Sequence, residues 1–308
     1  MDLLSRIDCW QQRHRATAFV FAVQKKYGDD RGGYLAALIT YYAFLSVFPL
    51  LLAAFTVVAY VLADDVSAIH TLEKHIGSYP ILGSAAHQLA GKRLQGSPVA
   101  LTVGILGLLY GATGLAQAAQ FTMEQAWNVP AKDRPGFLPR LARSFAWYIV
   151  FGLGIVASTF VASLGSWLHW SGGLALSTLV ALVLNIGLFF ASFWILSSRV
   201  SVRDMVPGAI VAGAAWTFLT GVGIGLTHKL AHSNSLYGTF APVLGLLAFL
   251  YLAATITIYS VEASAVRAQH LWPRSLTNKE LSEADRRQLS NLAKREARLQ
   301  GQKVSVDC

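Results

Sequence analysis

Long apolar runs alternate with short polar stretches along most of this chain. A transmembrane helix needs about 20 consecutive residues that are mostly apolar. Six windows reach that length, at roughly residues 35–62, 99–121, 144–168, 174–197, 207–228 and 242–263. The pattern predicts an all-α fold, namely a polytopic membrane protein with six transmembrane helices. It divides the chain into an N-terminal segment at 1–34, a transmembrane domain at 35–263 and a tail at 264–308.

The composition supports a membrane protein. Hydrophobic residues make up 54% of the 308 residues and charged residues only 13%, and the mean hydropathy is +0.48. Soluble domains carry about a quarter charged residues. The first apolar run is too long for the core of a signal peptide, so no cleaved leader is expected. The two cysteines, Cys9 and Cys308, lie near opposite ends and predict neither a disulfide framework nor a zinc site.

Lysine and arginine are unevenly distributed, and this predicts the orientation of the chain. Of the 25 Lys and Arg residues, 21 lie before residue 35 or in the segments 120–143, 198–206 and 263–308. Cytoplasmic loops carry the Lys/Arg excess, so both termini are expected in the cytoplasm. The net charge of +9 is therefore a topology signal first. It also favours anionic lipid headgroups as partners, and no nucleic acid is expected.

The two flanking segments have different patterns. Residues 1–34 mix aromatic and apolar side chains with arginines and lysines. This pattern fits an amphipathic helix lying on the inner leaflet, and equally a polar helix packed on the cytoplasmic loops. In the tail, Thr277-Asn-Lys-Glu280 predicts a capping box that opens a charged helix of about twenty residues. The tail is expected to be a separate, soluble element that lies on the membrane or binds a partner.

Two predicted spans carry stripes of special residues. In the first span Tyr42, Ser46 and Pro49 share one helix face, which indicates either a kinked packing helix or the lining of a polar pathway. In the second span small residues repeat every three or four positions, and they include Gly104, Gly107, Gly111 and Gly114. Small residues on one face let another backbone approach closely, so this stripe predicts a helix–helix contact.

Polar groups within the spans are the candidate functional residues. Gln117, Gln120 and Glu124 form a polar edge toward the predicted cytoplasmic mouth of span two. In span four, Asn185 is expected to make an interhelical hydrogen bond.

Span six places Thr255, Tyr259 and Glu262 on one stripe. A charged residue at a helix centre costs about 2.5–3.5 kcal/mol to insert and less toward the interface, so the stripe is expected to face protein or water. Glu262 is expected to snorkel, to accept a bond from Tyr259 or a neighbouring span, or to pair with a basic loop residue. Its role is open: a proton- or substrate-responsive carboxylate at an inner gate, or a tie that fixes the helix.

No constellation for catalysis is apparent. Six of the eight histidines fall on the predicted outer side, and His228 and His232 are four residues apart without a third ligand. We therefore expect no metal, no cofactor and no enzyme activity.

Three ordered motifs resemble the YihY/BrkB membrane family. They are LAALITYYAFLSVFPLL at 35–51, VPGAI at 206–210, and LYGTFAP at 236–242 running into Glu262. The similarity covers about residues 30–268. The chain departs from the family at Ser260-Val261, where members usually have Gly-Ala. The resemblance implies six membrane helices with cytoplasmic termini, in a family once labelled ribonuclease BN.

These observations favour a multi-pass protein of the bacterial inner membrane with a transport-type role, a candidate translocator of a lipid or other amphiphile. The alternative is a membrane scaffold or regulator that binds anionic lipid or protein partners through its basic segments. A homo-oligomer is compatible with both hypotheses. The nine polar or kinked positions named above in spans one, two and six are the candidate pathway or gate.

Overall fold

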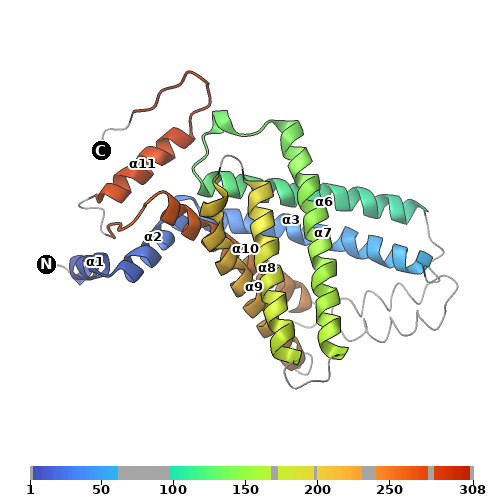
Figure 1. Ribbon diagram of the computed structural model, residues 1–308. Coiled ribbons are helices and arrows are strands. Elements are labelled where there is room, and N and C mark those ends of the chain that lie inside the picture. Colours follow the sequence, from blue (N-terminus) through green and yellow to red (C-terminus); the bar gives the residue numbers. More distant parts are fainter. Residues whose placement is uncertain are drawn as a thin grey trace. The chain divides into compact units, whose positions relative to one another are not determined.

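The computed structural model describes residues 3–61, 98–167, 173–197, 200–230, 241–276 and 281–305 (Figure 1). Within these ranges the regular structure is entirely helical. The elements are α1 (Leu3–Arg13), α2 (Arg15–Asp29), α3 (Gly32–Val61), α6 (Pro98–Ala126), the short 3₁₀ helix η1 (Ala131–Asp133), α7 (Phe137–Trp167), α8 (Gly173–Leu196), α9 (Val202–Leu230), α10 (Ala241–Ala268) and α11 (Glu283–Arg295).

Each predicted apolar window coincides with one long helix, in the order α3, α6, α7, α8, α9 and α10. Among the described residues, three segments are long and apolar enough to cross a membrane: Thr102–Ala126 of α6, Leu176–Leu196 of α8 and Val243–Ala268 of α10. The part of α3 whose side chains are described without a gap, Gly32–Val47, is also apolar. The all-helical prediction and the membrane-protein prediction are confirmed at this level, while six complete spans and the side of the termini remain predictions.

The chain forms two compact units, described separately. Unit 1 contains Met1–Ala36, Ala116–Gly221 and Ala253–Cys308, and unit 2 contains Ala37–Leu115 and Val222–Leu252. In unit 1 two long helices end at residues with left-handed backbone, Asn128 after α6 (φ 53°) and His270 after α10 (φ 55°). At each end the next residue donates its N–H to the carbonyl five positions back, Val129 to Glu124 and Leu271 to Val266. These are Schellman motifs, which stop a helix sharply.

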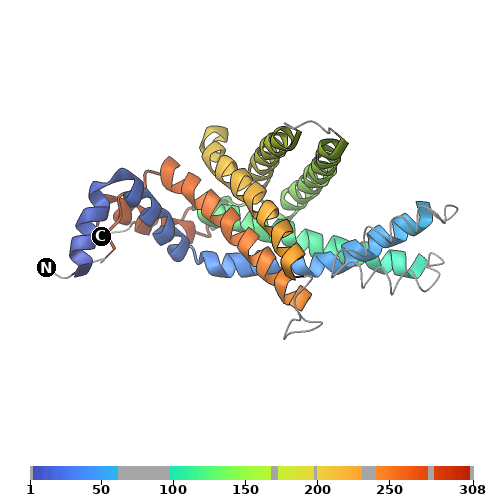
Figure 2. The same ribbon diagram turned by 90° about the horizontal axis from the view of Figure 1, so that it is seen from below.

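The membrane-capable helix α8 packs on both of its neighbours in unit 1. Helices α7 and α8 lie side by side (Figure 1, Figure 2). Between α8 and α9, Asn185 Nδ2 donates to Thr217 Oγ1 at 3.0 Å, so the predicted interhelical hydrogen bond is confirmed. A Cβ at Gly213 would lie 2.6 Å from the backbone nitrogen of Ile186, so only glycine permits this approach of α9 to α8.

The N-terminal segment packs against the end of α10. Ala22 and Val23 of α2 form a buried apolar cluster with Val266 and Leu271. Around this cluster, partly buried Phe19, Tyr259, Ala263 and Trp272 complete the contact. Of the two alternatives for residues 1–34, the structure supports a helix packed on the rest of the chain for α2, because the apolar face of α2 is covered by α10.

The tail differs from its prediction in two ways. Helix α11 has 13 residues and begins after Ser282, whose hydroxyl accepts from the Asp285 N–H while the Asp285 carboxylate accepts from the Ser282 N–H. The predicted opening at Thr277–Glu280 lies outside the described residues. The tail is also joined to the rest of unit 1 by buried ion pairs, and both views show α11 on the same side of unit 1 as α1 and α2 (Figure 1, Figure 2).

Candidate functional site

Glu262 lies near the C-terminal end of α10 and is completely buried. Its carboxylate forms an ion pair of 2.9 Å with Lys26 Nζ of α2, which is itself completely buried. Lys26 also pairs with Asp30 one helical turn later. Asp30 in turn accepts from Arg295 of α11 at 2.6 Å. We call Lys26, Asp30, Glu262 and Arg295 the central network, which has two bases and two acids.

The central network keeps its lysine charged. Burial alone lowers the pKa of the Lys26 ammonium, but attraction by Glu262 and Asp30 outweighs burial, and the pKa is raised from its ordinary value. The expected pairing of Glu262 with a base is thus present, but the partner is Lys26 in α2. The i, i+4 spacing of Lys26 and Asp30 is typical of a helical ion pair, but it does not indicate that Lys26 also pairs with Glu262.

The other members of the predicted α10 stripe have different surroundings. The Tyr259 hydroxyl donates to Gln24 Oε1 at 2.6 Å, and its ring stacks on Tyr27 with centroids 4.1 Å apart. Tyr259 therefore binds α2 and does not donate to Glu262. The Thr255 hydroxyl is buried without a hydrogen-bond partner among the described residues. The stripe thus joins one ion-paired carboxylate, one packed tyrosine and one unpartnered hydroxyl.

A second carboxylate cluster, not anticipated from the sequence, attaches the tail to the N-terminal helices. Asp285 of α11 pairs with Arg274 at 2.8 Å and with Lys25 at 3.0 Å, and it also accepts from the Ser275 N–H at 2.9 Å. Burial raises the pKa of Asp285, but the Ser275 N–H and the Lys25 and Arg274 cations outweigh it and hold the pKa at about 2. The sequence shows these residues only as scattered charges.

Asp8 of α1 extends this cluster. Its carboxylate accepts from the Ser275 hydroxyl at 3.0 Å and from the side chains of Gln11 and Gln12. Burial raises the pKa of Asp8, but these hydrogen bonds outweigh it and lower the pKa below its ordinary value. The tail residues 274–276 are therefore held by α1 as well as by α2.

Glu124 near the end of α6 is buried beside an excess of arginines. Its carboxylate lies 3.5 Å from Arg134 Nε and 3.8 Å from Arg140 Nη2. Arg143 also interacts with it electrostatically. One turn earlier, Gln120 Nε2 donates to the Arg140 carbonyl at 3.1 Å and to Ser144 Oγ at 3.0 Å. Of the predicted polar edge, Gln120 and Glu124 are thus buried against α7 and the segment before it, whereas Gln117 is half-buried.

Unit 2 brings two predicted stripes together. The glycine face of α6 meets the Tyr42–Pro49 face of α3: Gly107 contacts Pro49, Gly111 contacts Ser46 and Gly114 contacts Tyr42. A Cβ at Gly111 would lie 3.1 Å from the Ser46 Cα, so the backbones approach closely there. The Ser46 hydroxyl donates to the Tyr42 carbonyl at 2.7 Å within its own helix. Gly104, the remaining glycine of the stripe, is buried.

No group of three or more metal-ligating side chains occurs within the described ranges. His228 is described only as part of α9, and His232 lies outside the described residues. The sites described above can exchange ion-pair partners, form hydrogen bonds and bind charged groups.

Comparison with known proteins gives consistent similarities. The family model described as virulence factor BrkB matches residues 23–285. A relative named ribonuclease-like protein YfkH, from Bacillus subtilis, is 24% identical over 273 residues, which cover 81% of this chain and 94% of the relative. The inner membrane protein YhjD of Escherichia coli is 24% identical over 275 residues, which cover 80% of each chain. No solved structure matches the chain significantly.

Proposed function

Because the chain belongs to the BrkB virulence factor family, we propose that it is a multi-pass protein of the bacterial inner membrane that translocates a lipid or another amphiphile. Three membrane-capable segments support membrane insertion. The printed name of the Escherichia coli relative supports the inner membrane as the location. In this proposal both termini are cytoplasmic and the protein is not an enzyme.

The observation that carries the proposal is the burial of Glu262 inside a membrane-capable helix. Ionisable residues in membrane helices are costly and commonly mark pathways or gates. Among the described residues the carboxylate pairs with one base, Lys26, and that base also pairs with a second acid, Asp30. Lys26 can therefore remain paired when Glu262 separates from it, which lowers the cost of moving α10 away from α2. The ion pair acts as a latch on α10 in this mechanism.

The α3–α6 contact is the second element of the proposal. Small residues let two helices slide or separate without exposing large side chains, and the α6 side of this contact consists of Gly107, Gly111 and Gly114. Tyr42, Ser46 and Pro49 would line a polar path when the helices part. In the described state, the glycines of α6 occupy that face.

A lipid-scrambling assay in proteoliposomes tests this function. Wild type is expected to move a fluorescent phospholipid between leaflets. Glu262→Gln and Tyr42→Phe are expected to slow it at least about tenfold, a barrier increase of about 1.4 kcal/mol. Glu296→Gln is the matched control, because this glutamate is exposed and its ion pair with Arg295 is long, at 4.0 Å. A wild-type protein that is folded and inactive toward a broad lipid panel would exclude the translocator.

A glycine pair provides a steric control. Gly111→Leu would collide with Ser46, whereas Gly152→Leu points into open space. We expect only the first substitution to change scrambling at equal incorporation. Equal effects of both would remove the α3–α6 contact from the mechanism.

The alternative is a scaffold or regulator, which the folded assembly of both termini in unit 1 favours. Deleting 268–308 is a poor test, because it would remove Arg274, Asp285 and Arg295 from buried ion pairs. Arg13→Glu with Arg15→Glu changes exposed charges only. Loss of partner or lipid capture by this double variant, with scrambling absent from wild type, would support the scaffold.

A further inference from the structure

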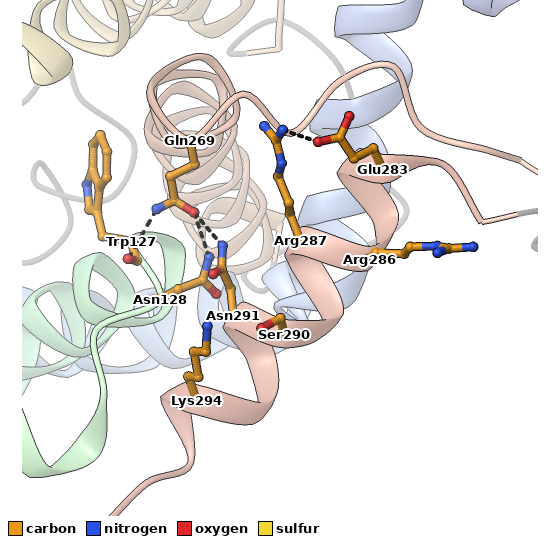
Figure 3. Close-up of a pocket in the computed structure, with 9 residues that line it drawn as sticks. All are labelled: Trp127, Asn128, Gln269, Glu283, Arg286, Arg287, Ser290, Asn291 and Lys294. Atoms are coloured by element: carbon orange, nitrogen blue, oxygen red, sulfur yellow. Dashed lines mark hydrogen bonds and ion pairs between the residues drawn. The ribbon is translucent and has the colours of Figure 1, made fainter. Parts of the chain in front are cut away.

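A surface pocket of about 590 Å³ lies where α11 crosses the ends of α6 and α10. Its lining consists of Trp127, Asn128, Gln269, Glu283, Arg286, Arg287, Ser290, Asn291 and Lys294. Figure 3 shows Gln269 facing α11, with Trp127 and Asn128 on the opposite wall. The volume is within the usual range for small-molecule sites, which is about 300–1,000 Å³.

The amide groups of the pocket are fixed in place. Gln269 Nε2 donates to the Trp127 carbonyl at 3.2 Å, and its Oε1 accepts from Asn128 at 3.0 Å and from Asn291 at 3.2 Å (Figure 3). Asn128 and Gln269 also belong to the Schellman ends of α6 and α10. This wall is therefore preorganised, which lowers the entropic cost of binding.

Helix α11 presents a continuous polar face to the pocket. Its lining residues follow the spacing of one helix face, at positions 283, 286, 287, 290, 291 and 294. The opposite face is anchored, because Ala284, Asp285 and Gln288 are buried. The pocket residues are thus held by a helix that cannot rotate without breaking the Asp285 cluster.

The charge of the pocket is positive. Three cations, Arg286, Arg287 and Lys294, face one carboxylate. Among the described residues Glu283 pairs with Arg287, in an exposed contact that contributes little to stability. Lys294 and Arg286 make no ion pair within the described part of the chain. In Figure 3 Lys294 reaches the amide cluster, and Arg286 extends outward at the rim.

We propose that this pocket binds a phosphate-bearing anion, either a soluble phosphate monoester or the headgroup of an anionic phospholipid. Lys294 and Arg287 would hold the phosphate oxygens, because ammonium and guanidinium groups bind phosphate through charge-assisted hydrogen bonds. Ser290 and Asn291 supply neutral donors between them. The space exceeds that of inorganic phosphate, so the organic part of the ligand lies along Trp127. The bound anion would join α11 to the ends of two membrane-capable helices.

Titration of the full-length protein in detergent, in buffer free of phosphate and sulfate, tests the site. The probes are glycerol 3-phosphate and a short-chain phosphatidate, with a short-chain phosphatidylcholine as the zwitterionic control. Arg287→Gln with Lys294→Gln is expected to raise the Kd at least about tenfold, the loss of charged hydrogen bonds. Arg298→Gln with Lys303→Gln removes the same charge from exposed positions outside the pocket, and we expect less than about a twofold change.

A third variant is expected to change the affinity for the anion in the opposite direction. Glu283→Gln releases Arg287 from its competitor, so affinity for the anion is expected to rise. Binding of both probes supports a soluble phosphate ester as the ligand, and binding of phosphatidate alone supports a lipid headgroup. The proposal would be overturned if neither probe binds, if the two double variants weaken binding equally, or if Glu283→Gln binds the anion more weakly.

Discussion

Two glutamates close to the ends of membrane-capable helices, Glu262 in α10 and Glu124 in α6, are both buried but have different electrostatic surroundings. Glu262 belongs to a network of two acids and two bases, and its lysine lies at 2.9 Å. Glu124 faces several arginines at 3.5 Å and beyond, and those arginines are partly exposed. Glu262 thus belongs to a buried network with equal numbers of acids and bases, whereas Glu124 lies beside an excess of arginines.

The difference indicates which carboxylate depends on its partners. A buried charge that loses its partner has no water to replace it, so the loss is large. When a carboxylate has long contacts to partly exposed arginines, water replaces those contacts. The loss in the free energy of unfolding is therefore small. Both carboxylates are buried, so their burial does not predict which site loses more stability without its partners. The exposure of the partner bases does predict it.

The largest effect is expected for Lys26→Met. It leaves Asp30 paired with Arg295 but removes the base that pairs with the buried Glu262, and breaking a buried pair costs about 3–5 kcal/mol. Denaturant unfolding in detergent would measure the loss. Lys303→Met, at an exposed position, is the control and should change stability by less than about 0.5 kcal/mol. A Lys26→Met protein as stable as this control would show that the central network is not a structural tie.

The double variant Lys26→Met with Glu262→Leu comes next. It removes both members of one pair and leaves Asp30 paired with Arg295. Replacing a whole buried pair by apolar residues is often neutral or stabilising by about 1–4 kcal/mol. We therefore expect the double variant to be more stable than Lys26→Met alone. Additive losses in the double-mutant cycle would contradict the assigned pairing.

The stability of wild type and of Asp285→Asn, measured over a range of pH, adds a third carboxylate to the comparison. The folded pKa of Asp285 is about 2, below the ordinary 3.8. A lowered pKa means that the charged form stabilises the fold, by about 2 kcal/mol near neutral pH. This contribution is fully present above about pH 4 and is lost as the pH falls toward about 2. The stability gap between wild type and variant should shrink over that window, and a constant gap would reject the electrostatic cause.

The smallest effect is expected for Glu124→Gln, at about 1 kcal/mol or less, because its ion pairs are long and their bases are partly exposed. Glu262→Gln, measured in parallel, should cost more. The same unfolding assay serves for both variants. If Glu124→Gln is the more damaging of the two, the ranking by exposure of the bases is wrong.

Local patterns in the sequence predicted much of this fold. The apolar runs predicted the long helices. Asn185 makes the expected interhelical hydrogen bond, because a buried amide in a span has few other hydrogen-bond partners. The capping box that opens α11, at Ser282 and Asp285, was not predicted, because the pattern at Thr277–Glu280 precedes it by only five residues and has the same form. The α10 carboxylate could be identified from its position, but its pairing with Lys26 could not, because many bases precede the first span and only tertiary packing selects one.

The ion pairs between the two ends of the chain constrain how the protein is made. Asp30 precedes Arg295 by 265 positions, which at about 5–20 residues per second is roughly 15–50 s of synthesis. During that time Lys26 and Asp30 lack their partners in α10 and α11, while the intervening helices are synthesised and inserted. The N-terminal helices therefore complete their packing last, although they leave the ribosome first. Proteins stalled or cleaved before α10 is made should display α2 as an unprotected segment, open to quality-control proteases.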